Sequence, residues 1–178
     1  SEFDTELLKR YQDEPYFRLQ HPMLEVEPVS LPEGYFLQEA SVPDFVEHIN
    51  SCYDDIGITV PEMQRNLLRE QYSSELWLAV KEDYRGKIVA TGIAELDREI
   101  GEGVLEWIQV SKDYRRCGLG SYLVSELLWR MRKAAKFVTV SGKCNNPDCP
   151  EGLYRKCGFC GNDVWHILRE REQTAFAE

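Results

Sequence analysis

One stretch of the sequence changes its hydrophobic period twice. The sequence pattern predicts a short apolar strand over residues 105–110 and a helix from about residue 120. It predicts a second strand over residues 137–141. Apolar residues in the helix recur at steps of three and four, namely Leu123, Val124, Leu127, Leu128, Met131 and Ala135. A strand, a helix and a strand in this order favour a parallel strand pair joined by a right-handed crossover. The chain is therefore expected to belong to the α/β class.

The other segments also alternate between strand-like and helix-like patterns. Strands are expected over 35–40, 76–81, 88–96, 104–110 and 164–168, and helices over 4–12, 61–72 and 150–156. Ser41 and Asp44 are candidate capping residues of a further helix, with Pro43 in its first turn. Prolines at 15, 22, 28 and 32 break up the early chain. We therefore expect an N-terminal extension or arm over 1–33 and one domain over 34–178.

Length and composition exclude several classes. A chain of 178 residues fits one domain with a sizeable core. No apolar run reaches the roughly 18 residues that a membrane span needs. No basic start followed by a short apolar segment marks a secretory signal. The six cysteines are thus expected to be reduced thiols of a cytoplasmic protein without membrane partners.

The charge is acidic overall and unevenly placed. The net charge of −10 argues against a nucleic-acid partner, which would require a basic surface. Residues 1–100 hold 9 basic and 21 acidic side chains, whereas residues 101–178 hold 12 and 10. This division suggests a cationic ligand for the first half and an anionic one for the second. A merely solvated acidic surface explains the first half equally well.

The turn between strand and helix, residues 110–121, contains Gly118 and Gly120 next to Arg115 and Arg116. Glycines permit a tight turn and a close approach of a ligand. The free N–H groups and positive dipole end of a helix N-terminus attract anions, so a pyrophosphate would fit here. The Walker pattern and the third glycine of the dinucleotide fingerprint are both absent. On spacing alone, a structural turn is as good an explanation as a phosphate site.

Two motifs resemble those of one family. Residues 115–120 read Arg-Arg-Cys-Gly-Leu-Gly, and residues 153–159 read Leu-Tyr-Arg-Lys-Cys-Gly-Phe. The first resembles the Gln/Arg-x-x-Gly-x-Gly/Ala signature of the GNAT superfamily, the acyl-CoA-dependent N-acyltransferases. The second resembles the Leu-Tyr-x-x-x-Gly-Phe segment of the same family. Both stand in the family's order, and the resemblance covers roughly residues 34–170.

The resemblance implies a single GNAT-like domain. Its mixed central sheet would be flanked by helices, with splayed fourth and fifth strands and acetyl-CoA in the wedge. Backbone groups of Ile108 and Val110 would pair with the pantetheine arm, and the amides of residues 116–121 would hold the pyrophosphate. Pro147 stands where the family often has Asn, so Asn146 would take that role. The implied cofactor residues are Ile108, Gln109, Val110, Arg115, Arg116, Cys117, Gly118, Leu119, Gly120, Ser121 and Asn146.

Attack on a thioester requires a neutral amine and a stabilised leaving thiolate. Strand alternation puts Val104, Glu106, Ile108 and Val110 on one face, so Glu106 is the candidate base. A surface-facing or ion-paired glutamate remains the alternative, and Glu95 on the neighbouring strand is a lesser candidate base. The resemblance makes Tyr154 the candidate proton donor to the thiolate, with a packed aromatic as the alternative. It implies an N-acetyltransferase that acts on an amine, which the acidic first half suggests is cationic, by direct attack in a ternary complex.

Two other hypotheses for the function remain. A non-catalytic acyl-CoA sensor would keep the phosphate loop without a working base. A zinc-stabilised interaction domain would use four cysteines as ligands, at positions 144, 149, 157 and 160. The acyltransferase segment already accounts for Gly158 and Phe159 between the last two of these cysteines, so no metal is expected. A homodimer is left open.

Overall fold

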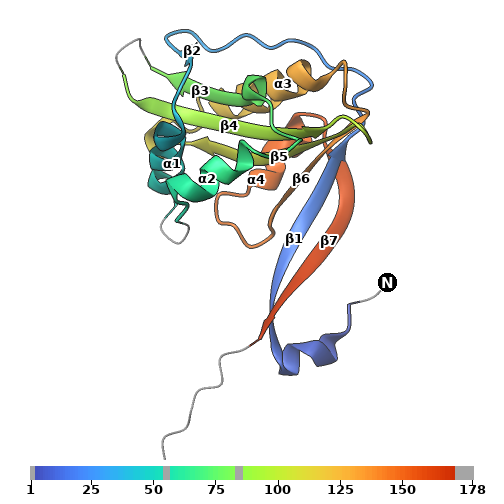
Figure 1. Cartoon of the computed structure of the whole chain (residues 1–178). Coiled ribbons are helices and arrows are strands. Elements are labelled where there is room, and N and C mark those ends of the chain that lie inside the picture. Colours follow the sequence, from blue (N-terminus) through green and yellow to red (C-terminus); the bar gives the residue numbers. More distant parts are fainter. Residues whose placement is uncertain (1–2, 54–56, 83–85, 171–178) are drawn as a thin grey trace, which may run out of the picture.

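The computed structural model describes residues 3–53, 57–82 and 86–170. Within these ranges a seven-stranded mixed sheet has the order β2-β3-β4-β5-β6-β1-β7 (Figure 1). Its strands are β1 (Tyr11–His21), β2 (Phe36–Gln38), β3 (Trp77–Lys81), β4 (Ile88–Asp97), β5 (Glu102–Val110), β6 (Phe137–Lys143) and β7 (Cys160–Glu170). The helices are α1 (Val42–Ser51), α2 (Val60–Asn66), α3 (Leu119–Met131) and α4 (Pro150–Lys156), with 3-10 turns η1 (Thr5–Lys9), η2 (Ser74–Leu76) and η3 (Lys112–Tyr114). The α/β class and the mixed sheet are confirmed.

Helices cover both faces of the sheet. α1 and α2 lie on one face, and α3 and α4 on the other (Figure 1). α1 begins as the sequence predicts, because the Asp44 carboxylate accepts from the Ser41 amide at 2.7 Å and the Ser41 hydroxyl accepts from the Asp44 amide. α2 has the same type of N-terminal cap but ends at Asn66, six residues before the predicted end.

The core has a layer on each side of the sheet. Leu123 and Leu127 of α3 are fully buried on one side, and Ile49 and Met63 are fully buried on the other. A Cβ atom on Gly92 of β4 would lie 3.3 Å from both leucine side chains. α3 therefore lies close against β4 and fixes the direction in which its N-terminus points.

Residues 11–21 do not form part of a separate arm. They form β1, which lies between β6 and β7, and its residues Phe17 and Leu19 are buried. The sheet therefore begins before the expected domain boundary at residue 33, because β1 already belongs to it. The prolines did not prevent this pairing. Among the described residues Pro15 pairs with β7 alone, and Pro22 follows the end of β1.

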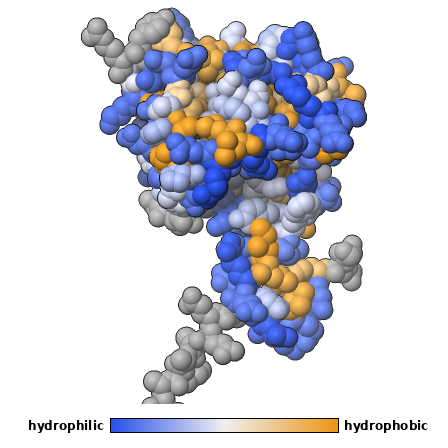
Figure 2. Space-filling model, viewed as in Figure 1, coloured by the Kyte–Doolittle hydropathy of each residue, from blue (hydrophilic) through white to orange (hydrophobic). Residues whose placement is uncertain are grey.

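The outer halves of β1 and β7 form a two-stranded ribbon that projects from the body (Figure 1). Hydrophobic side chains gather along it (Figure 2), and Val164, Trp165 and Ile167 of β7 are exposed. The Arg18 guanidinium stacks over the Trp165 ring at 4.5 Å. In the part of the chain that is described, no helix has the length and apolar character to cross a membrane.

Candidate functional site

β5 and β6 pair over only part of their length. The parallel register joins residues 102–105 of β5 to residues 137–140 of β6, which confirms the predicted parallel pair. From residue 107 to residue 110, β5 has a strand partner only on its β4 side among the described residues. The two strands therefore enclose a wedge lined by backbone groups of β5 that no strand occupies, as expected for the splayed pair.

The turn between β5 and α3 leaves a helix N-terminus without a side-chain cap. Gly118, the N-cap residue, has a φ of +85°, a conformation that favours glycine. Its lack of a side chain leaves the first amides of α3 without a capping acceptor. Arg116 also has a positive φ, of +66°. The turn therefore presents N–H groups at the positive end of the α3 dipole, where an anion is stabilised.

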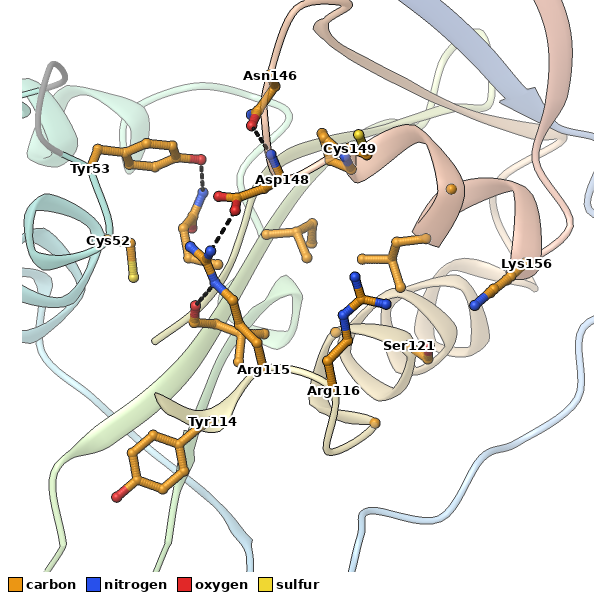
Figure 3. A pocket seen from close by; sticks show the side chains of 18 residues that line it. Cys52, Tyr53, Tyr114, Arg115, Arg116, Ser121, Asn146, Asp148, Cys149 and Lys156 are labelled. Carbon is orange, nitrogen blue, oxygen red and sulfur yellow. Dashed lines mark hydrogen bonds and ion pairs between the residues drawn. The ribbon is translucent and has the colours of Figure 1, made fainter. Parts of the chain in front are cut away.

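A pocket of about 560 Å³ extends from this turn into the wedge. Residues of the turn, the end of β5, the end of α1 and the start of α4 line it (Figure 3). The lining residues are Cys52, Tyr53, Ile108, Gln109, Val110, Tyr114, Arg115, Arg116, Gly118, Gly120, Ser121, Asn146, Asp148, Cys149, Pro150, Gly152, Leu153 and Lys156.

One end of the pocket is basic. Arg116, Lys156 and Ser121 lie together beside the N-terminus of α3 (Figure 3). A Cβ atom on Gly120 would lie 3.1 Å from a methyl group of Leu153 in α4, so α3 and α4 approach closely here. Two cations, a hydroxyl and free amides are a suitable set of partners for a pyrophosphate.

Arg115 crosses the middle of the pocket. Its Nη1 atom lies 2.6 Å from Oδ1 of Asp148, and its Nε–H donates to the carbonyl of Val110 at 3.3 Å (Figure 3). The Asp148 amide in turn donates to Oδ1 of Asn146 at 2.9 Å. The guanidinium thus connects the end of β5 to the loop before α4, and its charge is paired with a carboxylate.

The other end of the pocket is polar and lies beside α1. The Nε2–H of Gln109, a residue that is only 5% exposed, donates to the Tyr53 hydroxyl at 3.3 Å. Next to them, His48 is buried, with Nδ1 2.9 Å from the Thr91 hydroxyl and Nε2 3.0 Å from the Ser111 hydroxyl. Burial lowers the pKa of His48, which favours the neutral ring.

Tyr154, the predicted proton donor, lies in α4 and is buried. Its ring packs against those of Phe17, at 6.2 Å between centroids, and Phe159, at 5.8 Å. Burial raises the pKa of its hydroxyl, and the nearby Tyr53 raises it further. The phenol therefore stays protonated at neutral pH. Tyr154 is not among the residues that line the pocket, although its neighbour Leu153 is.

Glu106 does not share a face with Ile108 and Val110. Trp107 pairs with Ile93 and Leu105 pairs with Ala94, so Glu106 is the extra residue of a β-bulge. Beyond the bulge the alternation is reversed, because Ile108 and Val110 pack on the α3 side and Trp107 packs on the α1 side. The strict alternation expected from the sequence is therefore wrong at this position.

The bulge puts Glu106 next to Glu95 and Arg69. Oε1 of Glu95, a buried residue, lies 2.6 Å from Nη1 of Arg69. Glu106 is exposed, but surrounding protein atoms remove part of its hydration. This desolvation raises the pKa of its carboxyl group, and the charge of Glu95 raises it further. A carboxylate with a raised pKa is suited to accept a proton.

Nine of the eleven predicted cofactor residues line the pocket. Of the other two, Leu119 is buried in the core and Cys117 is exposed in the turn. Sequence reasoning missed the lining residues Cys52, Tyr53, Tyr114, Asp148, Cys149, Pro150, Gly152, Leu153 and Lys156. Most of them come from α4 and the loop before it, and the Leu-Tyr motif already pointed to that segment.

The cysteines are free thiols in the described structure, and Cys144, Cys149 and Cys160 are exposed. No cluster of three or more His, Cys, Asp or Glu side chains with the geometry of a metal site is found among residues 3–53, 57–82 and 86–170. The expected absence of zinc stays a prediction, which elemental analysis of protein purified without chelator would test.

Residues 73–160 match the model of a family described as the acetyltransferase (GNAT) domain. These residues carry a GNAT acetyltransferase domain. The matched residues include the wedge, the turn and α4 up to the first residue of β7. No curated protein matches the chain in sequence.

Solved structures share the GNAT fold. A GCN5-related N-acetyltransferase from Sphaerobacter thermophilus superposes with a TM-score of 0.74 at 19% identity, over 90% of this chain and 52% of that chain. Glucosamine-6-phosphate N-acetyltransferase from Arabidopsis thaliana superposes with a TM-score of 0.54 at 22% identity, over 75% of this chain and 96% of that chain. Ard1 from Thermoplasma volcanium superposes with a TM-score of 0.61 at 18% identity, over 77% of this chain and 97% of that chain. The chain thus spans about half the length of the Sphaerobacter protein.

Proposed function

We propose that the chain transfers an acetyl group from acetyl-CoA to a primary amine by direct attack in a ternary complex. The observation that carries the proposal is the pocket in the β5–β6 wedge, which begins at the uncapped N-terminus of α3. A GNAT domain and GNAT-fold neighbours support acetyl transfer as the reaction.

The residues of the pocket suit acetyl-CoA at both of its ends. The amides of α3 with Arg116 and Lys156 would hold the pyrophosphate, and glycine at position 120 lets α3 and α4 approach closely beside this site. The unpaired edge of β5 would pair with the amides of the pantetheine arm as a further strand would. The thioester would then lie deeper in the wedge.

Glu106 and Tyr154 are the proposed catalytic residues. The Glu106 carboxylate would accept the proton of the attacking ammonium group, directly or through a water molecule. The Tyr154 hydroxyl would donate a proton to the departing thiolate, for which a protonated phenol is required. Cys117 lies in the exposed turn, away from the thioester end, and is not proposed as a nucleophile.

The proposed acceptor is cationic. Glu95 and Glu106 interact electrostatically on the α1 side of the sheet, and residues 1–100 carry a net charge of −12. An acidic surface raises the local concentration of protonated amines, and this effect weakens with salt. An anionic best acceptor, such as an acidic amino acid, would contradict this part of the proposal.

The test is CoA release from acetyl-CoA with a panel of amines, together with calorimetric titration of CoA. Release that depends on the amine supports the proposal. CoA binding without transfer to any amine would favour the sensor alternative. Absence of both binding and transfer would refute the proposed function.

A further inference from the structure

The polar end of the pocket contains a buried atom without a partner. Oε1 of Gln109 is inaccessible to solvent and has no hydrogen-bond partner among the described residues. An unpaired buried carbonyl is costly, since it loses its water without gaining a donor. Because Gln109 lines the pocket, a bound ligand is a natural source of that donor.

The side of the sheet on which Gln109 lies indicates which ligand it serves. Its amide contacts Tyr53, which follows α1, whereas Ile108 and Val110 pack toward α3. The Tyr53 ring meets the Trp107 ring edge to face at 6.4 Å. Gln109, Tyr53 and Trp107 thus form a row on the α1 side that reaches the bulge at Glu106.

An amine that loses its proton to Glu106 would therefore arrive along this row. Resting on the proposed function, we propose that Gln109 binds the acceptor amine, with its Oε1 accepting a hydrogen bond from the amine N–H. Tyr53 is the positioning residue, because its hydroxyl accepts from Nε2 and orients the amide. At 3.3 Å this bond is slightly longer than a normal hydrogen bond, so the side chain can tilt at small cost and bring Oε1 to the acceptor while Nε2 stays beside the Tyr53 hydroxyl.

Gln109→Met tests this role, because methionine keeps the length and apolar packing of the side chain but has neither an acceptor oxygen nor N–H donors. The KM for the amine should rise roughly 3- to 10-fold, the loss expected for one hydrogen bond. The affinity for CoA should stay unchanged in calorimetry. The melting temperature should be equal or higher, since an unpaired buried oxygen is removed. Gln12→Met, at an exposed position of the β1–β7 ribbon, is the matched control.

Tyr53→Phe is the second variant and should raise the same KM by a smaller factor. An unchanged KM for the amine in both folded variants would overturn the inference. Weaker CoA binding in Gln109→Met would also overturn it, because Oε1 would then serve the pantetheine arm. Failure of the proposed function is a separate result, since the wild-type chain would then transfer acetyl to no amine.

Discussion

Arg115 and Asp148 form an ion pair of 2.6 Å between two walls of the same pocket. The two residues are 33 positions apart in sequence. Both are partly exposed, so the pair contributes little to stability. We expect a stronger effect on an anionic ligand, because the Asp148 carboxylate pairs with a cation that would otherwise face the ligand.

Removing this carboxylate should strengthen CoA binding. In Asp148→Asn the Arg115 charge is no longer paired, so CoA affinity should rise roughly 2- to 5-fold at low salt and less at high salt. Calorimetric titrations at two ionic strengths measure both effects. Asp163→Asn changes the net charge equally on exposed β7 and should leave the affinity unchanged. Weaker binding in Asp148→Asn would show that the bridge holds the pocket in shape.

Gly120 should be intolerant of a carboxylate. Gly120→Asp places a negative charge at the N-terminus of α3, and CoA affinity should fall by more than about 10-fold. Gly120→Ala separates packing from charge, because the nearest atom to its Cβ is a flexible methyl group of Leu153 at 3.1 Å and the Val110 methyl group lies at an ordinary 3.8 Å. The alanine variant should retain most of the affinity. Equal CoA affinities of the aspartate variant and the wild type would contradict a phosphate-binding site at the N-terminus of α3.

Activity should fall on acidification through the pKa of Glu106. Desolvation and the charge of Glu95 raise this pKa above that of an ordinary glutamate. A protonated carboxyl group cannot accept a proton from the amine. We therefore expect kcat/KM to fall as the pH decreases through the raised pKa of Glu106. Glu106→Gln should abolish this limb of the pH profile and lower kcat. Glu95→Gln removes a neighbouring charge and should move the limb to lower pH. A profile that none of these changes alters would exclude Glu106 as the base.

Tyr154→Phe should lower kcat about 100-fold with CoA affinity nearly intact. The variant keeps the packing against Phe17 and Phe159 and removes only the hydroxyl, and general acid catalysis contributes at least about that factor. Tyr122→Phe, at another buried tyrosine, should have wild-type kcat. Single-turnover rates are the appropriate measurement if product release limits kcat. A wild-type rate in Tyr154→Phe would assign the residue to the core.

Local patterns predicted much of the fold, because they come from neighbours in sequence. The period of α3 and the glycines of the turn are of this kind, and the Ser41–Asp44 cap formed as expected. The end of α2 was not predictable in this way. Its apolar pattern continues through Leu67 and Leu68, but helical structure stops at Asn66 and Leu68 is exposed.

The missed features depend on residues far apart in sequence. The bulge at Glu106 arises from the register between β5 and β4, which the alternation of β5 alone cannot show. The Gln109–Tyr53 contact spans 56 positions and required the place of α1 on the sheet. β1 was missed because its partners follow it by more than 100 residues.

The place of β1 in the sheet sets an order of events during synthesis. Phe17 and Leu19 of β1 are synthesised before the partner strands β6 and β7. Their side chains therefore stay exposed to solvent until both partner strands have been synthesised. Such long-range pairing slows folding. The last strands to be synthesised therefore complete the sheet around the first, and removing the first 33 residues would leave β6 and β7 with bare edges open to association with other chains.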